Sequence, residues 1–267
     1  MVPLADGGPS SYLGRRNPTI KFAAVIAGSL PLTFVFDPLT PLLLFIITLL
    51  AGRFLGKLTL REQLRPLAVF VLAGIAILLA NIFFNKQNGT SAVVFSVGAL
   101  HVTHAALWAA GSLWTRILAF ALMSLVFVRT TQPQHLLLSL VHQLHLNDRV
   151  AYGVIVGYRM LPVFMADYDT IHAAQRLRGV REGSGLLHPF SRFRRYALPL
   201  LTGAIRRAGR IAVAMDARAF GALPRRSYRE RMVVTAADWL FLAAAVVVIA
   251  AVVTGIGLSS FGRFTFS

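Results

Sequence analysis

The sequence predicts an all-α integral membrane protein with about five transmembrane helices and three further helices on the cytoplasmic side. Three observations support this class. The 267 residues are 56% hydrophobic and 14% charged, whereas a soluble domain normally carries about a quarter charged residues. Five apolar runs approach the roughly 20 residues that a helix needs to cross the hydrocarbon core of a bilayer. The interval between the fourth and fifth runs is long, polar and rich in arginine.

The chain is expected to open with a short, disordered cytoplasmic tail, residues 1–18, because this stretch has neither the apolar core nor the cleavage pattern of a signal peptide. Four transmembrane helices are expected within residues 19–128, and the last one, followed by a C-terminal tail, within residues 232–267. The predicted spans are residues 19–36, 40–56, 66–84, 112–128 and 236–258.

Basic residues at the ends of these runs predict the orientation, because Lys and Arg concentrate in cytoplasmic loops. Arg15, Arg16 and Lys21 lie around the start of the first span, and four more basic residues surround the loop between spans two and three. The loop between spans one and two has none. The N-terminus is therefore expected in the cytoplasm and the C-terminus outside. Arg53 and Arg116 belong to short spans and are expected to snorkel from the span ends.

The segment 85–111 has a single basic residue, Lys86, and is apolar enough to form a sixth span. A sixth span would move the region that follows to the outside. Residues 129–231, however, carry 17 Lys plus Arg against 6 Asp plus Glu, an excess that is typical of the cytoplasmic side. We therefore expect the segment 85–111 to be a re-entrant or outer-surface helix that leads into span four.

The cytoplasmic block, residues 129–231, is too long for an idle loop and is predicted to contain three helices, at 134–146, 148–178 and about 190–220. In the second, apolar residues recur every three or four positions from Val150 to His172, which is helical periodicity. In the third, the same spacing gives a seam rich in alanine, which lets another helix approach closely. Gly179 is expected to cap the second helix in a left-handed conformation.

Two groups of arginines stand out in this block. Arg206, Arg207 and Arg210 are interpreted as a solvated basic face beside anionic lipid. Arg178 and Arg218 differ, because each lies in the last turn of a long amphipathic helix. The helix dipole favours arginine there, but two such ends in one block indicate a repeated docking element. A guanidinium at a helix tip can bind a carboxylate through two parallel hydrogen bonds, so the expected partner is a protein with an acidic groove.

The sequence resembles the transmembrane T component of energy-coupling factor transporters, over roughly residues 19–255. These are bacterial importers of vitamins and metal ions, related to ABC transporters. The resemblance rests on stretches that occur in the family's order and spacing: DPLTPLLL, LWTRIL, TTQPQHLLLSL, YRMLPVFMADYDTIHAAQRLRG and RAGRIAVAMDARAFG.

The resemblance implies a non-catalytic subunit of a bacterial cytoplasmic (inner) membrane, with residues 129–231 as the coupling region. Family members carry two Ala-Arg-Gly-like signatures, which fall on Leu177-Arg178-Gly179 and Ala217-Arg218-Ala219, with Leu177 in place of Ala and Ala219 in place of Gly. The resemblance implies that these tips dock to two ABC ATPase subunits. It also implies that apolar faces of the coupling helices hold a small membrane S component, which binds the vitamin or transition-metal ion. The residues expected for that packing are Leu161, Met165, Tyr168, Ala208, Ala212 and Met215.

The sequence lacks the usual marks of an enzyme or a cofactor site. The stretch GRFLGKLT is not a phosphate-binding loop, because only three residues separate its glycines and Leu58 stands where Ser or Thr would hold magnesium. No carboxylate or Cys completes a zinc site with the histidines, which are interpreted as surface or packing residues. Asp167 and Asp169 point to different faces of a helix and form no catalytic dyad. We expect no metal and no cofactor.

Two other functions remain alternatives. A stand-alone channel or secondary transporter would need ionisable residues that line a path inside the spans, and only Lys21, Arg53, Arg116 and Asp238 occur there, near span ends. A lipid-binding membrane scaffold would explain the net charge of +17 but not the paired arginine tips. Nucleic acid is not an expected partner, because the positional bias of the charge fits cytoplasmic loops beside a bilayer.

Overall fold

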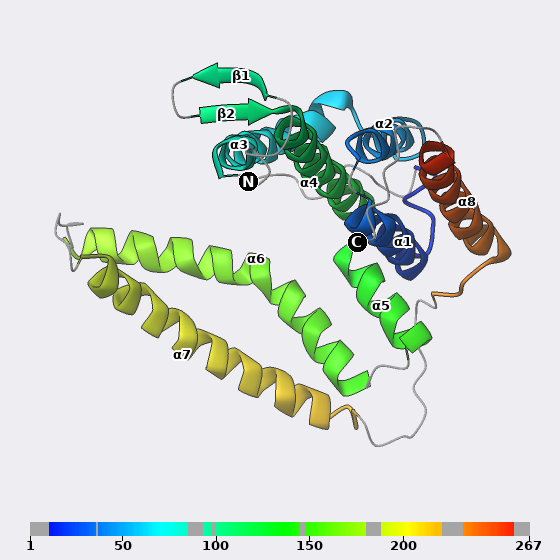
Figure 1. The fold of residues 1–267 in the computed structure, drawn as a ribbon. Coiled ribbons are helices and arrows are strands. Elements are labelled where there is room, and N and C mark those ends of the chain that lie inside the picture. The colour runs from blue at the N-terminus through cyan, green and yellow to red at the C-terminus, as the bar shows by residue number, and fades with distance from the viewer. Residues whose placement is uncertain are drawn as a thin grey trace. The chain divides into compact units, whose positions relative to one another are not determined.

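The computed structural model describes residues 11–35, 37–84, 93–97, 100–144, 148–179, 188–220 and 232–258. These residues form eight helices and one short β-hairpin (Figure 1). Residues 1–10 of the expected disordered tail lie outside the described residues, but the expectation is wrong for residues 11–17, because Leu13 is buried in the core and Asn17 caps α1. The elements are α1 (Pro18–Phe34), α2 (Leu39–Phe54), α3 (Leu60–Phe84), β1 (Val93–Val97), β2 (Leu100–Thr103), α4 (His104–Thr130), α5 (Pro133–Leu144), α6 (Asp148–Leu177), α7 (His188–Asp216) and α8 (Ala236–Leu258).

The chain divides into two compact units. The first contains residues 1–139 and 232–267 and holds α1 to α4, the start of α5, and α8. The second contains residues 140–231 and holds α6 and α7. The helical class predicted from the sequence is confirmed. Helix α8 and most of α4 are long and apolar enough to cross a membrane, while α1 and α2 are apolar but shorter, at 17 and 16 residues.

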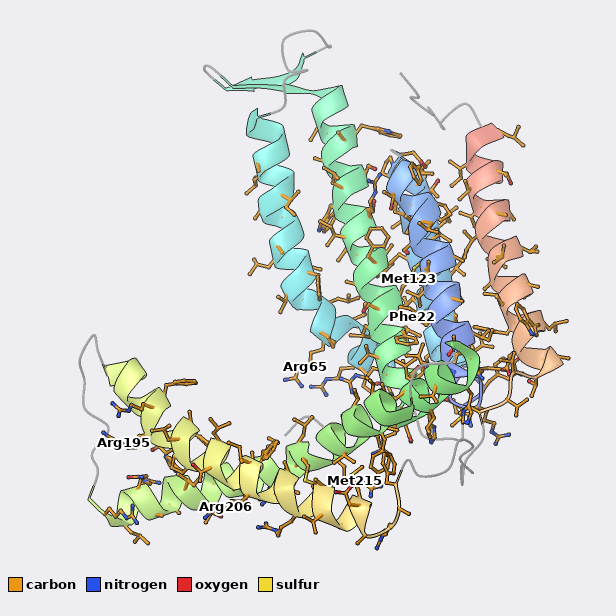
Figure 2. All side chains as sticks on the ribbon, turned by 90° about the horizontal axis from the view of Figure 1, so that it is seen from below. Phe22, Arg65, Met123, Arg195, Arg206 and Met215 are labelled. Carbon is orange, nitrogen blue, oxygen red and sulfur yellow. The ribbon has the colours of Figure 1, made fainter. Side chains whose placement is uncertain are left out.

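Helix α4 is at the centre of the first unit and packs against α1, α2 and α3, while α8 packs against α1 and α2. Figure 2 shows α3, α4, α1 and α8 running alongside one another. Two groups of buried apolar residues hold the bundle together. Leu122 and Val126 of α4 belong to the first, with Leu67 of α3. Ala119 and Met123 of α4 belong to the second, with Leu44 of α2 and Leu32 of α1.

Two basic side chains tie α4 to both ends of α1. The Lys21 ammonium, on a residue only 4% exposed, donates a hydrogen bond of 2.8 Å to the carbonyl oxygen of Thr130, the last residue of α4. The Arg116 guanidinium donates to the carbonyl oxygen of Val35, the residue that follows α1. The same fourteen residues, or about 21 Å of helix, separate the two bonds on each helix. Each cation therefore neutralises a helix C-terminus of its antiparallel neighbour, and Arg116 does not snorkel from a span end as expected.

The start of α8 is fixed by a buried carboxylate. Asp238 accepts hydrogen bonds from the Thr235 amide and hydroxyl at 2.9 and 2.8 Å, which caps α8. Its other oxygen accepts a bond of 3.2 Å from the Asn17 amide and lies 3.6 Å from the Arg16 guanidinium. The first and last transmembrane segments therefore meet through one carboxylate, although 221 residues separate Asn17 from Asp238 in sequence.

The helix expected in the segment 85–111 is present only in residues 104–111, the start of α4, and is wrong for the two stretches before it that the structure describes. Residues 93–97 and 100–103 form an antiparallel hairpin, with Val97 opposite Leu100 and Phe95 opposite Val102, and α4 begins at His104. The cause is the β-branched content of this stretch, which favours strands. A short apolar run does not by its hydrophobicity distinguish a strand from a helix.

Candidate functional site: the α6–α7 hairpin

Helices α6 and α7 form an antiparallel pair, which Figures 1 and 2 both show. Two sets of ring contacts hold the pair near its ends. Near the start of α6, the Tyr152 ring lies 4.9 Å from the Phe220 ring, just after α7. Near the other end, the Tyr196 ring of α7 lies 5.5 Å from Tyr168 and 5.9 Å from His172. Pro162 lies between these contacts, inside α6, where proline disrupts the helical hydrogen-bond ladder.

The two arginines singled out in the sequence occupy the same position of the same structural motif. After α6, the Gly179 amide donates to the Arg176 carbonyl at 3.0 Å. After α7, the Ala219 amide donates to Asp216 at 2.9 Å and the Phe220 amide to Met215 at 3.0 Å, which are the two bonds of a Schellman cap. Gly179 and Ala219 both have left-handed backbones, with φ of 74° and 53°. Arg178 and Arg218 are therefore equivalent C-cap residues, and both are exposed.

The two tips lie at opposite ends of the hairpin. The Tyr152–Phe220 contact places the end of α7 beside the start of α6, and the helix from Tyr152 to Arg178 is about 40 Å long. Arg178 and Arg218 cannot reach one small groove together. The residues around them also differ: Leu177, 90% exposed, and Arg176 precede Arg178, whereas Asp216 and Ala217 precede Arg218. The first tip is bulky and carries two positive charges; the second is small and close to neutral.

A groove of about 460 Å³ lies between the stretch of α6 from Tyr152 to Phe164 and the stretch of α7 from Ala204 to Met215. The α7 wall includes Ala208, Ala212 and Met215, three of the six residues expected to pack against the S component or within the coupling helices. Two glycines of the α6 wall, Gly153 and Gly157, would place an added methyl group in open space. The groove thus exposes backbone on one side and alanines on the other, a combination that permits close helix packing.

The other three predicted packing residues do not line this groove. Leu161 and Met165 are 53% and 58% exposed, and Tyr168 belongs to the aromatic cluster with His172 and Tyr196. The periodic face of α6 that the sequence reveals is thus open at Leu161 and Met165, whereas its last residues, Tyr168 and His172, contact Tyr196 of α7. The side of α6 that faces α7 holds Tyr152, Val156 and Phe164, which sequence periodicity did not single out.

An ion pair joins the two helices near the groove. The Arg207 guanidinium lies 3.0 Å from the Asp167 carboxylate. The interpretation of Arg207 as part of a solvated basic face is therefore wrong, whereas Arg206 and Arg210 are exposed, and Figure 2 shows Arg206 between Arg195 and Met215 along α7. The pair was missed because residues 40 positions apart meet only when the hairpin register is known.

The described residues contain no group of three or more His, Cys, Asp or Glu side chains that could hold a metal ion. His172 is held between two tyrosine rings. The features that stand out in the described part of the hairpin are the two arginines at helix C-caps and the exposed apolar side chains.

Comparison with known protein families shows which family the chain belongs to. A family model described as cobalt transport protein, CbiQ, matches residues 9–229. The chain belongs to the CbiQ family. Two relatives are energy-coupling factor transporter transmembrane proteins EcfT. One, from Thermosediminibacter oceani, is 25% identical over 86% of this chain and 88% of its own length. The other, from Limosilactobacillus fermentum, is 28% identical over 89% of this chain and 91% of its own length.

A further relative is a much longer protein, of which this chain matches only one part. An ABC transporter ATP-binding protein of Bifidobacterium longum is 26% identical over 94% of this chain, but the match spans only 33% of that protein. Membership of the CbiQ family and the EcfT relatives identify the chain as a membrane-embedded transporter component. The resemblance inferred from the sequence motifs is confirmed at this level.

Proposed function

We propose that this protein is the transmembrane subunit of an energy-coupling factor importer, which couples ATP hydrolysis by two partner ATPases to uptake through a small membrane S component. The chain itself is proposed to be non-catalytic. The observation that carries the proposal is the pair of equivalent arginine C-caps, Arg178 and Arg218, at opposite ends of the α6–α7 hairpin. Two exposed tips about 40 Å apart suit two separate protein grooves.

The ATP-binding relative supports an ATPase partner. In that protein a segment similar to this whole chain occupies one third of the length, within a polypeptide named for ATP binding. Segments that are fused in one organism often act together as separate chains in another. We infer that the present chain meets its ATPases as separate subunits.

The exposed apolar residues of the hairpin support a membrane partner. Leu161 and Met165 of α6, with Leu198 and Leu201 of α7, are at least half exposed, which is costly for a surface that stays in water. We infer that this face and the groove lined by Ala208, Ala212 and Met215 receive the S component, whose substrate is a vitamin or a transition-metal ion. The hairpin is proposed to lie in the cytoplasm of a bacterial inner membrane, with the N-terminus cytoplasmic and the C-terminus outside.

Charge reversal at both tips tests the proposal. The tagged full-length chain is purified from its native membranes in mild detergent, and the proteins that come with it are identified by mass spectrometry. The wild type should retain two ATPase subunits, or two copies of one, and a small membrane protein. The double variant Arg178→Glu/Arg218→Glu should lose the ATPases, because two like charges would then face each other at each groove.

The matched control is Arg206→Glu/Arg210→Glu, which makes the same change in net charge at exposed α7 positions away from the tips. It should retain the ATPases. Equal retention by the tip variant and the wild type would refute the proposed docking. If the wild type purifies without any ATPase, even with added ATP, the channel or scaffold alternatives gain the support that the coupling function loses.

A further inference from the structure

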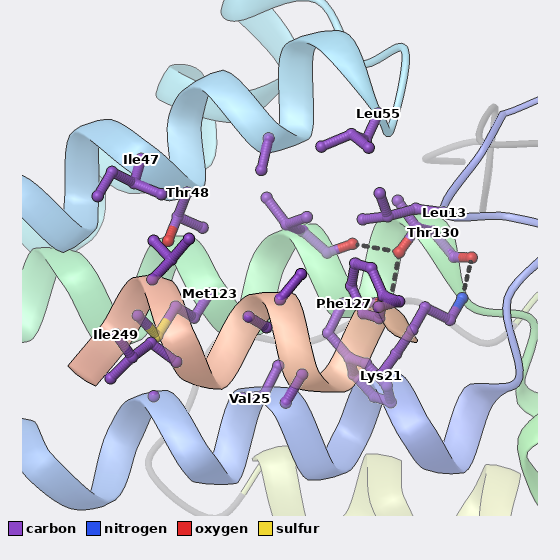
Figure 3. A pocket seen from close by; sticks show the side chains of 18 of the residues that line it. Leu13, Lys21, Val25, Ile47, Thr48, Leu55, Met123, Phe127, Thr130 and Ile249 are labelled. Carbon is purple, nitrogen blue, oxygen red and sulfur yellow. Dashed lines mark hydrogen bonds between the residues drawn. The ribbon is translucent and has the colours of Figure 1, made fainter. Parts of the chain in front are cut away.

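A second groove, of about 400 Å³, lies in the transmembrane unit between α1, α2, α4 and α8. Its walls are almost entirely apolar and include Val25 of α1, Ile47 of α2, Met123 of α4 and Ile249 of α8 (Figure 3). Small side chains line much of the groove and leave the space between the four helices unfilled, among them Ala24, Ala51, Ala244 and Ala245. Because these helices belong to a membrane protein, the medium around the groove is lipid rather than water.

The groove is long and narrow and follows the helix axes. On α2 its wall runs from Leu44 to Leu55, and on α8 from Leu240 to Ile249. At a rise of about 1.5 Å per residue these stretches are about 16 and 14 Å long. One leaflet of a bilayer has about half of the 30 Å hydrocarbon thickness. The groove thus has the length of an acyl chain that lies in a single leaflet.

The Thr48 hydroxyl at one end of the groove donates a hydrogen bond to the Leu44 carbonyl oxygen within α2, so the polar end is the opposite one, which holds the charged side chain of the lining. Figure 3 shows Lys21 and Thr130 at that end and Ile47, Thr48 and Ile249 at the other. The Lys21 ammonium has three N–H donors, and one bonds the Thr130 carbonyl oxygen. Tyr12 also lines the groove, and the Arg16 guanidinium lies 4.2 Å from the centre of its ring. Arg16 does not line the groove itself and lies 3.6 Å from the Asp238 carboxylate, so two cations and one carboxylate lie at or beside the polar end and leave a net positive charge there.

We propose that this groove binds one acyl chain of an anionic phospholipid, with the lipid phosphate beside Lys21 and Arg16. The apolar wall selects a hydrocarbon chain, the length selects one leaflet, and the net charge of the polar end selects an anionic headgroup. The polar end is also the side where the basic loops gather, and the inner leaflet is where anionic lipids attract such residues. The proposal does not depend on ATPase or S-component binding.

Lipid retention tests this site. The full-length protein is reconstituted into vesicles of equal parts phosphatidylglycerol and phosphatidylcholine with identical acyl chains. It is then extracted in mild detergent and analysed by native mass spectrometry. The wild type should retain about one phosphatidylglycerol per chain in preference to phosphatidylcholine. Ala244→Phe places a ring in the groove and should lower this retention at least about tenfold, which corresponds to about 1.4 kcal/mol.

The control is Ala243→Phe, one residue away on the exposed surface of α8 and outside the groove lining; it should retain the lipid like the wild type. If Ala244→Phe does not give a monodisperse protein, Ala51→Leu fills the groove from α2 instead. Equal retention of the two lipids, or wild-type retention in the filled groove, would overturn the site. A co-purifying protein that cross-links from Ala244→Cys in place of lipid would overturn it as well.

Discussion

The two arginine tips differ at one residue whose effect can be calculated. Gly179 and Ala219 occupy the same left-handed position after α6 and α7, but only glycine adopts that conformation freely. We therefore expect Ala219→Gly to stabilise the second tip and Gly179→Ala to destabilise the first. A methyl group added at Gly179 would meet no atom within 4 Å, so the effect at that tip arises from the backbone and not from a clash.

The magnitude follows from two opposing contributions. A left-handed backbone costs a residue with a side chain about 1–2 kcal/mol. Replacing alanine by glycine also loosens the open state of the segment, which costs about 0.4–1 kcal/mol. The net change is about 0.5–1 kcal/mol at each tip, with opposite signs. Such a change alters the equilibrium between closed and open cap about two- to fivefold.

Amide hydrogen exchange measures this equilibrium, because local opening governs exchange at an exposed helix end. The amide at position 219 donates to the Asp216 carbonyl and the Phe220 amide to the Met215 carbonyl. In Ala219→Gly both amides should exchange about two to five times more slowly. In Gly179→Ala, the amide at position 179 should exchange faster by the same factor. Within each variant the unmodified tip is the control. The equivalence of the two caps would be refuted if the two substitutions changed exchange at their own tips in the same direction, or if neither changed it.

Three further predictions concern the described bundle. A methyl group on Gly74 of α3 would overlap the Trp114 indole of α4. Gly74→Ala should therefore lower the free energy of unfolding by about 1–3 kcal/mol, the cost of overpacking, and shift the tryptophan emission. The control Gly255→Ala adds a methyl group in open space and should do neither. Asp238→Asn removes charge from four contacts at the start of α8 and should cost about 1–3 kcal/mol in detergent unfolding, whereas Asp169→Asn at an exposed site should cost nothing measurable. Hydrogen bonds from Thr59 lower the pKa of Glu62. The stabilising contribution of Glu62 to the first turn of α3 should therefore be complete above the ordinary glutamate pKa and lost as pH falls through the lowered pKa. Amide hydrogen exchange in this turn, measured as a function of pH, should show the transition in the wild type and lack it in Glu62→Gln.

Most of the helices could be predicted from the sequence, but the contacts between them could not. Apolar run length placed α1, α2, α3 and α8 within a few residues, since crossing a bilayer requires such runs. For α4 it placed the end within two residues but missed the start by eight, because the apolar stretch before it was ambiguous and part of it forms the β1–β2 hairpin. Lys21 and Arg116 were assigned to loops or span ends by their charge. Their roles as caps of α4 and α1 depend on antiparallel register, which charge alone does not encode.

At the candidate site, the sequence predicted a local feature, the helix cap at Gly179, but not the contacts between α6 and α7. Gly179 after a periodic run predicts a left-handed cap, and the structure has φ of 74° there. Ala219 gave no such signal, yet it adopts the same conformation because the Ala219 and Phe220 amides complete the cap. The contact between Asp167 and Arg207, and the one between Tyr152 and Phe220, join separate helices. No periodicity within either helix reveals which of its faces turns toward the other.

The two units differ in what holds them together, and this difference bears on function. Buried polar bonds at Lys21 and Asp238 fix the ends of the transmembrane helices, and breaking such bonds leaves buried groups unsatisfied. The α6–α7 pair has ring contacts near its ends, one partly exposed ion pair and an apolar groove between them. Segments with few buried contacts open at low free energy. A partner that fills the groove or binds a tip is therefore expected to change the hairpin more than the bundle, as the proposed coupling role requires.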